Sequence, residues 1–255
     1  MPLTLLTVPC LSDNYAYLIH DPASGATAVI DVPEAAPIQA ALQAKGWSLS
    51  DILITHHHDD HIAGVAALRA ATGAAVTGAA ADAHRLPPLD HAVSEGDTVK
   101  VGAARGVVLD VSGHTVGHIA FHFADDALVF TADSLMAAGC GRLFEGTPDQ
   151  MWASLSKLMA LPPQTQVCSG HEYTASNIRF ALSLEPGNSA LISRAERVAE
   201  ARKNGRATVP SLLSEELATN PFLRAPLPTL KAAVGMADAS DARCFAEIRK
   251  RKDTF

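Results

Sequence analysis

The chain has 255 residues, is 48% hydrophobic and carries a formal net charge of −7 at pH 7. This length and apolar fraction are sufficient for a substantial buried core, in one large domain or in one domain with a small appendage. The acidic balance argues against a general nucleic-acid-binding protein, and no apolar stretch is long enough to cross a bilayer. The four cysteines, Cys10, Cys140, Cys168 and Cys244, show no CxxC pairing, so we expect reduced packing residues and a soluble cytoplasmic protein.

Apolar runs bounded by turn residues predict three early strands, over residues 3–8, 15–20 and 28–31. A helix is expected over 34–45, ended by Gly46, and a strand over 50–55 follows it. The next helix should begin at His61 and end at Gly73. Further strands are predicted over 107–111, 118–123 and 128–131. This mixed order favours an α/β core whose sheets are not all parallel.

The composition and periodicity of the sequence change after about Gly170. Alanine-rich, charged segments with helical periodicity follow, including residues 188–203 and 239–252, separated by proline-rich stretches. We therefore expect a main domain over residues 1–170 and a small helical domain over 171–255, packed together because no long flexible linker separates them.

A dense group of histidines follows the predicted strand that contains Ile52–Ile54. The run from Thr55 to His61 contains the pattern His-x-His-x-Asp-His. Side chains at positions i and i+2 of extended chain project to one side, so His56 and His58 can hold one ion while Asp60 and His61 aim elsewhere. Chance histidines or a purification tag would be the ordinary explanation, but the excess is large and the run is internal. The pattern indicates two adjacent metal positions and a metal-dependent hydrolase.

Three further ligand candidates, His114, Asp133 and His171, lie in glycine-flanked turns or at predicted strand ends. Such positions combine a rigid scaffold with an open cleft, and a neighbouring glycine lets the backbone approach closely. Taken singly, each is more typical of an ordinary turn residue. Only their combination with the histidine loop makes them persuasive ligands.

The joint pattern resembles the metallo-β-lactamase superfamily, and the flanking residues resemble glyoxalase II, the hydroxyacylglutathione hydrolases, along most of the chain. The motifs that carry this resemblance are Asp13-Asn14-Tyr15, the histidine loop, Gly113-His114-Thr115 with Gly117-His118, Thr131-Ala132-Asp133, Ala138-Gly139-Cys140-Gly141-Arg142, Phe144-Glu145-Gly146, Gly170-His171-Glu172-Tyr173-Thr174, Glu185-Pro186-Gly187-Asn188, Asn220-Pro221-Phe222 and Arg249-Lys250-Arg251-Lys252-Asp253. The last five separate this family from lactonases and β-lactamases.

The resemblance implies a four-layer αββα sandwich, the metallo-β-lactamase fold, over residues 1–170 and a C-terminal α-helical glutathione-binding domain over 171–255. It implies two divalent metal ions, with Zn2+ preferred and iron or manganese as alternatives, because all three accept imidazole and carboxylate ligands. The implied ligands are His56, His58 and His114 for the first ion, Asp60, His61 and His171 for the second, and Asp133 as a bridge. We expect His57, Asp59, His118 and His122 to be outside the ligand set, and Asp31 to accept a hydrogen bond from a ligand histidine.

By the same resemblance, the activity is hydrolysis of S-(2-hydroxyacyl)glutathione thioesters, such as S-lactoylglutathione to lactate and glutathione, in methylglyoxal detoxification. The nucleophile would be a metal-bridging hydroxide oriented by Asp60, so no Ser or Cys nucleophile is needed. The residues expected to contact the substrate are Arg142, Phe144, Tyr173, Arg249 and Lys252. Arg142 and Phe144 stand where some relatives have Lys and Tyr, so the details of these two contacts stay open.

Two other interpretations remain. The first is another enzyme of the same superfamily, such as a persulfide dioxygenase with one iron, against which the residues beyond Glu185 and the basic cluster from Arg249 to Lys252 argue. The second is a non-catalytic module that binds metal or glutathione, which the seven His and Asp ligands disfavour because structural zinc sites are closed and rich in cysteine. We expect a monomer with a small-molecule glutathione thioester as its partner, and neither nucleic acid nor membrane.

Overall fold

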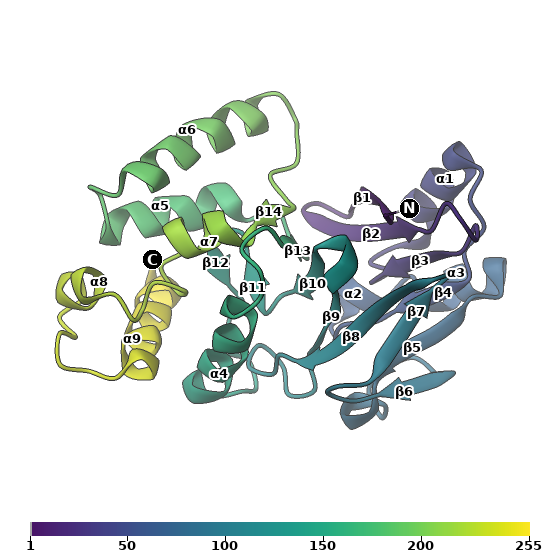
Figure 1. Cartoon of the computed structure of the whole chain (residues 1–255), viewed down its shortest axis with the longest axis horizontal. Coiled ribbons are helices and arrows are strands. Elements are labelled where there is room, and N and C mark those ends of the chain that lie inside the picture. Colours follow the sequence, from purple (N-terminus) through teal and green to yellow (C-terminus); the bar gives the residue numbers. More distant parts are fainter. Residues whose placement is uncertain (1) are drawn as a thin grey trace. The chain divides into compact units, whose positions relative to one another are not determined.

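The computed structural model describes residues 2–255; Met1, the first residue of the predicted main domain, lies outside them. The chain forms two compact units (Figure 1). Unit 1 is the chain up to Asp110 together with Val116–Ala132, and unit 2 is Val111–Thr115 together with Asp133–Phe255. In the described residues, no helix combines the length and the apolar character needed to cross a membrane.

The described part of unit 1 contains two sheets and three α-helices. Its elements are β1 (Thr4–Cys10), β2 (Asn14–His20), β3 (Thr27–Ile30), α1 (Ala35–Lys45), β4 (Asp51–Leu53), α2 (Asp59–Ile62), α3 (Val65–Thr72), β5 (Ala75–Ala79), β6 (His91–Val93), β7 (Thr98–Val101), β8 (Ala104–Asp110), β9 (Ile119–Phe123) and β10 (Leu128–Ala132), with short 3-10 turns at Ala80–Asp82 and Ala124–Asp126. The first sheet has the order β1-β2-β3-β4-β5-β6, antiparallel as far as β3 and parallel from β3 onward. Strands β7 to β10 pair antiparallel in sequence order. The prediction of an α/β core with mixed sheets is confirmed.

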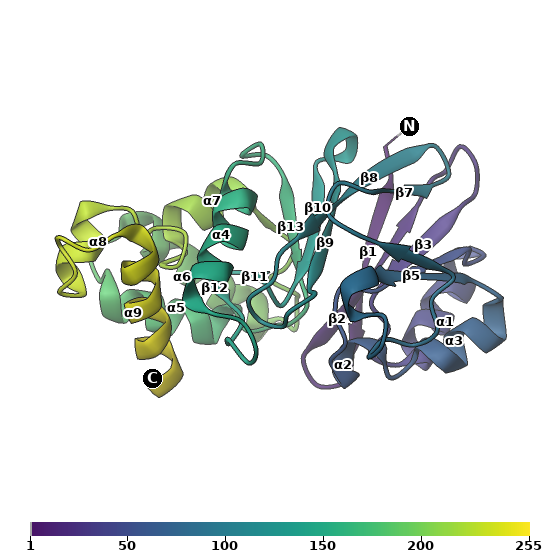
Figure 2. The ribbon, with the colours of Figure 1, turned by 90° about the horizontal axis from the view of Figure 1, so that it is seen from below.

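The core of unit 1 lies on both sides of the first sheet. Helices α1 and α3 cover one face (Figure 2). Their residues Ile38, Leu42 and Leu68 belong to one buried cluster with strand residues such as Ile52. The other face meets the antiparallel strands, because Tyr17 of β2 packs 5.7 Å from Phe130 of β10 between ring centroids. Because both faces of the sheet are covered, side chains that point to either face of β2 are buried, which is true of all its residues except His20.

The first helix ends as predicted, because Gly46 adopts a left-handed conformation with φ of +67°. The predicted helix from His61 to Gly73 was wrong in its continuity, since the chain forms α2 and then α3 with a break before Val65. A Cβ on Gly64 would lie 2.7 Å from the backbone nitrogen of Ala35. The break therefore lets the chain pass directly against the start of α1, which only glycine allows.

Unit 2 is mainly helical. Its elements are β11 (Leu135–Met136), β12 (Gly139–Cys140), α4 (Pro148–Met159), β13 (Gln166–Ser169), α5 (Thr174–Leu184), α6 (Ser189–Lys203), β14 (Ser211–Leu212), α7 (Leu213–Thr219), α8 (Pro228–Ala233) and α9 (Asp241–Thr254). The predicted helices over 188–203 and 239–252 are confirmed as α6 and α9, which begin after the capping residues Asn188 and Ser240. Strands β11 and β12 form a hairpin with Leu135 opposite Cys140.

We predict that Asp21 stabilises unit 1 only while it is ionised. Its carboxylate accepts hydrogen bonds from the backbone of Ala103, the Ser24 hydroxyl and the backbone of Ala23, and these bonds lower the pKa of Asp21 from 3.8 to about 2. A carboxyl pKa that folding lowers contributes stability that is complete above 3.8 and disappears as the pH falls to about 2. Asp21→Asn should therefore lower the urea midpoint at pH 7, and the difference from wild type should shrink between pH 4 and pH 2. A difference that stays constant over this range would contradict the assignment.

Candidate metal centre

The histidine loop of unit 1 begins where β4 ends. His56 is fully buried, and its ring lies 4.8 Å from that of His58 between centroids. His58 has extended backbone angles just before α2 begins at Asp59. The two histidines therefore share one side of an extended segment, as their spacing predicts, while Asp60 and His61 lie in the short helix that follows.

A buried carboxylate holds this loop from the neighbouring strand. Asp31 follows β3 and accepts hydrogen bonds from the backbone nitrogen and the hydroxyl of Thr55, each at 2.8 Å. Its Oδ2 also lies 2.8 Å from Nδ1 of His61. A carboxylate can only accept hydrogen bonds, so Nδ1 of His61 carries the proton and Nε2 is the atom that can bind a metal. The expected contact between Asp31 and a histidine of the predicted ligand set is confirmed.

Asn14 holds the Asp60 side chain in place, a role that its sequence motif did not predict. Its side-chain amide donates to the backbone carbonyl of Asp60 at 3.0 Å and to Oδ2 of the Asp60 carboxylate at 3.1 Å. Asn14 is buried at the start of β2, so the Asp60 side chain is fixed by an element 46 residues earlier in the chain. The Asp13-Asn14-Tyr15 motif was the signal in the sequence, although it gave no role for the amide.

Unit 2 brings together the other three predicted ligands. His114, Asp133 and His171 are all buried. Nε2 of His114 lies 3.5 Å from Oδ2 of Asp133, and Nε2 of His171 lies 3.3 Å from the same oxygen. One carboxylate oxygen therefore stands between two imidazole nitrogens.

The orientation of His114 is set by the segment that leaves the β11–β12 hairpin. Its Nδ1 donates to the backbone carbonyl of Arg142 at 2.7 Å, which leaves Nε2 on the side of Asp133. Gly141 is packed tightly here, because a Cβ at this position would lie 2.0 Å from the Asp133 carbonyl oxygen and 2.8 Å from Nδ1 of His114. The predicted ligands and the hairpin exit thus form one close-packed group.

These donors fit divalent first-row metals. Zinc binds imidazole nitrogen and carboxylate oxygen at about 2.0–2.1 Å, which at a tetrahedral angle places two ligand atoms roughly 3.3 Å apart. The two distances from Asp133 in unit 2 match this separation. In unit 1, donor atoms of Asp31, His56 and His61 lie within 4.8 Å of one another. The chain therefore contains groups of His and Asp that could hold metal ions.

The residues predicted to contact a substrate all belong to unit 2. Phe144 is 63% exposed and lies edge-on to His114 at 5.3 Å, and Tyr173 stacks on His171 with ring centroids 4.7 Å apart. Two of the predicted ligands therefore each have an exposed aromatic ring beside them.

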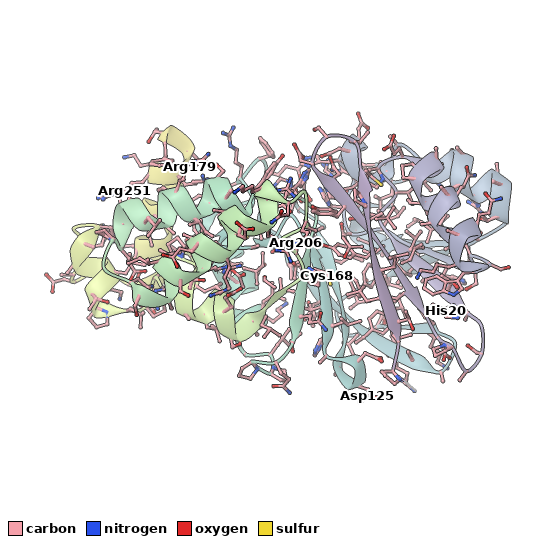
Figure 3. The ribbon with its side chains drawn as sticks, turned by 90° about the horizontal axis from the view of Figure 1, so that it is seen from above. His20, Asp125, Cys168, Arg179, Arg206 and Arg251 are labelled. Carbon is pink, nitrogen blue, oxygen red and sulfur yellow. The ribbon has the colours of Figure 1, made fainter. Side chains whose placement is uncertain are left out.

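Three arginines of unit 2 lie close enough to Lys252 to affect its charge. Burial lowers the pKa of Lys252, and the neighbouring charges of Arg249, Arg179 and Arg142 lower it further. Arg179, on α5 and labelled in Figure 3, was missed by the sequence analysis. Arg249 is itself buried, and its guanidinium donates to the Cys140 carbonyl and to Asp253.

The histidines expected to lie outside the ligand set have other surroundings. Nδ1 of His57 lies 2.9 Å from the buried Asp82 carboxylate. His118 stacks on the His56 ring at 4.5 Å, and burial lowers the pKa of His122 on β9. All four cysteines are buried and none of them forms a disulfide within the described residues, as expected of packing residues, and burial raises the pKa of Cys140 to about 11.

Comparison with known proteins first defines the class. The model of the metallo-beta-lactamase superfamily matches residues 12–171. Among solved structures, the crystal structure of BLEG-1, a B3 metallo-beta-lactamase, is similar with a TM-score of 0.67 and 20% identity, covering 86% of this chain and 99% of that chain. The predicted fold class, an α/β sandwich of the metallo-β-lactamase type followed by a helical C-terminal region, is confirmed.

The family follows from the rest of the chain. A model described as the hydroxyacylglutathione hydrolase C-terminus matches residues 172–255. Curated hydroxyacylglutathione hydrolases from Cereibacter sphaeroides (strain ATCC 17025 / ATH 2.4.3) and Fuscovulum blasticum are 70% and 69% identical, each over 100% of both chains. The chain therefore belongs to the hydroxyacylglutathione hydrolase family of the metallo-beta-lactamase superfamily. The two family models meet after residue 171 whereas the compact units divide elsewhere, so the domain boundary near residue 170 stays a prediction.

We predict that Asp31→Asn weakens metal binding without unfolding unit 1. The amide nitrogen of asparagine would donate to Nδ1 of His61, which moves the ring proton to Nε2 and removes that atom as a ligand. Metal affinity, measured by competition with a chromophoric chelator, should fall by about 10–100-fold. Asp51→Asn, on β4 of the same sheet, is the matched control and should bind as wild type does. Wild-type affinity in Asp31→Asn would show that His61 is not held as described.

Proposed function

We propose that the chain hydrolyses S-(2-hydroxyacyl)glutathione thioesters, such as S-lactoylglutathione to lactate and glutathione, in the cytoplasm. The observation that carries this proposal is the position of one Asp133 oxygen between His114 and His171, with exposed aromatic rings and a cationic group in the same unit. Relatives 70% identical over the whole chain carry the name hydroxyacylglutathione hydrolase, which supports the same activity.

We propose one set of ligands for each of two metal ions. Unit 1 would supply His56 and His58 to one ion and Asp60 and His61 to the other. His114 is proposed as the third ligand of the first ion and His171 as the third ligand of the second, and Asp133 would bridge, which its distances to both imidazoles support. We propose two zinc ions, because imidazole and carboxylate suit zinc, although iron and manganese accept the same donors.

Bound divalent ions would polarise the thioester carbonyl, which is the electrophile, and would lower the pKa of a bound water to about 7 so that it can act as the nucleophile. Asp60 orients the attacking water by accepting one of its hydrogen bonds, and Asn14 keeps the Asp60 carboxylate in place for this task. The leaving thiol has a pKa of about 8.5, so it departs as thiolate and needs no strong general acid. None of these steps uses a cysteine of the chain.

Recognition of glutathione rests on charge and on aromatic contact. Glutathione carries carboxylates, and a bound carboxylate would relieve the repulsion that Arg249, Arg179 and Arg142 exert on Lys252, which Asp253 offsets only in part. Arg142, Arg249 and Lys252 are the proposed cationic contacts. Phe144 and Tyr173 would line the path from this group to the predicted ligands His114 and His171.

The most direct test of the ligand sets compares two substitutions. Asp133→Ala removes the proposed bridge, so it should reduce the metal content for both ions and abolish hydrolysis of S-lactoylglutathione. His171→Ala should mainly reduce the second ion and leave about one metal per chain. Elemental analysis of both purified variants gives the result. Two metals per chain in Asp133→Ala would exclude the bridge.

A second test isolates substrate recognition. Lys252→Met removes a charge-assisted hydrogen bond worth on the order of 1.5–3 kcal/mol, so KM for S-lactoylglutathione should rise roughly ten- to a hundredfold with kcat nearly unchanged. Folding lowers the pKa of Lys252, so its charged form is less favourable in the folded state and the variant should melt no lower than wild type at neutral pH.

The matched control is Lys250→Met, because Lys250 is exposed on the same helix α9. A small thioester without carboxylates should be hydrolysed equally by wild type and by Lys252→Met. An equal loss on both substrates would mean that Lys252 supports the metal site or the fold, and its role in recognition would be withdrawn.

A further inference from the structure

The β11–β12 hairpin of unit 2 begins at Leu135, two residues after Asp133, and ends at Cys140, two residues before Arg142. The segment that enters the hairpin therefore carries the proposed bridging carboxylate, and the segment that leaves it supplies the carbonyl that holds His114. Gly141 fills the space between them without room for a side chain. Any shift of the hairpin must then move Asp133 and His114 relative to each other.

The hairpin makes only a short ladder of its own, with Leu135 opposite Cys140 and Met136 opposite Gly139. Its turn places Ala138 in the left-handed region with φ of +54°, which is unfavourable for a residue with a Cβ. So short and strained a hairpin needs external support to keep one conformation.

Four buried side chains from the helical part of the same unit supply that support. Together they form hydrogen bonds with the backbone of every residue from Met136 to Cys140. Asn177 donates to the Ala137 carbonyl at 3.0 Å, and Glu216 accepts from the Ala138 nitrogen at 2.8 Å. Asn220 donates to the carbonyls of Met136 at 3.1 Å and Gly139 at 2.9 Å, and Arg249 donates to the Cys140 carbonyl at 2.9 Å.

Glu216 is the centre of this support. Its Oε2 accepts from Ala138 and from the Asn220 amide, and its Oε1 accepts from Arg194 at 2.5 Å and from the Ser211 hydroxyl at 2.6 Å. All four partners are donors, so the carboxylate must remain a pure acceptor. The side chain is fully buried, which keeps water from replacing any of these bonds.

We propose that Glu216, with Asn220, is a positioning residue for the metal centre, which it reaches through the β11–β12 hairpin without touching metal or substrate. The inference rests on the proposed function, because it takes Asp133 and His114 as ligands. The helical region would then have a second task besides substrate binding. It would fix the spacing of Asp133 and His114, which precede that region in the sequence.

The test uses Glu216→Gln, which keeps the size of the side chain but replaces one carboxylate oxygen by an NH2 group. This NH2 group would then face hydrogen-bond donors and could not accept from them. Affinities for two equivalents of zinc should be measured by chelator competition on the folded variant, together with kcat and KM. We expect zinc to bind about 10–100-fold more weakly, kcat to fall, and KM to stay within about threefold of wild type. Amide hydrogen exchange over residues 135–142 should become faster.

Glu215→Gln is the matched control, because Glu215 is the neighbouring residue and also lies 3.3 Å from Arg194, but its carboxylate pairs with Arg194 and Arg197 and not with the backbone of the described hairpin. A purely structural role for Glu216 would lower the melting temperature and leave the zinc affinity of the folded protein unchanged, and this result would overturn the proposal. If Glu216→Gln does not fold, Asn177→Ala removes a single bond to Ala137 and should weaken zinc binding severalfold; wild-type affinity there would also overturn it. Wild-type protein that binds fewer than two zinc ions would instead contradict the proposed function.

Discussion

Nε2 of His114 and Nε2 of His171 both lie within 3.5 Å of one oxygen of the buried Asp133 carboxylate, and the surrounding structure is built to maintain these two distances. Each donor attracts water or a proton, and burial removes the water that would otherwise satisfy it. Unit 2 keeps His114 in place with a backbone carbonyl, and Gly141 lets the chain pass close enough to do so. Much of the local structure around Asp133 follows from the need to maintain this short spacing.

The same logic governs unit 1 with different residues. Asp31 fixes both the loop, through Thr55, and the ring proton of His61, while Asn14 fixes Asp60. Residues from two separate strands, Asn14 on β2 and Asp31 just after β3, thus hold one histidine loop. Asp31 has a φ of +57°, a conformation that costs about 1–3 kcal/mol and is retained because its carboxylate makes three hydrogen bonds in this position.

Local patterns predicted much of this architecture. The alternation of His56 and His58 after an apolar strand predicted their shared side, and Gly46 predicted the end of α1, because both features depend on neighbouring residues alone. The break at Gly64 escaped prediction, since it depends on the approach of Ala35, which is distant in the sequence. Helix α4 was also missed, although its capping box from Thr147 to Gln150 is visible in the sequence.

The parts that could not be predicted are those in which distant segments meet. The basic cluster near the C-terminus predicted substrate cations, yet nothing in the sequence indicates that Arg249 is buried against the Cys140 carbonyl, 109 residues away. Glu216 lies in an ordinary helical pattern, and its role is visible only because α7 places it at the hairpin turn. Hydrogen bonds between side chains and remote backbone leave no periodic signal in a single sequence.

The central claim is that His and Asp ligands of this chain hold two adjacent metal ions. X-ray absorption at the zinc edge of protein loaded with two equivalents of zinc tests it most directly, because the spectrum reports both the ligand atoms and the neighbouring metal. The account predicts a first shell of nitrogen and oxygen at about 2.0–2.1 Å with no sulfur, and a metal–metal distance of about 3.5–4 Å. A sulfur shell, or a spectrum of isolated zinc without a second metal at that distance, would contradict it.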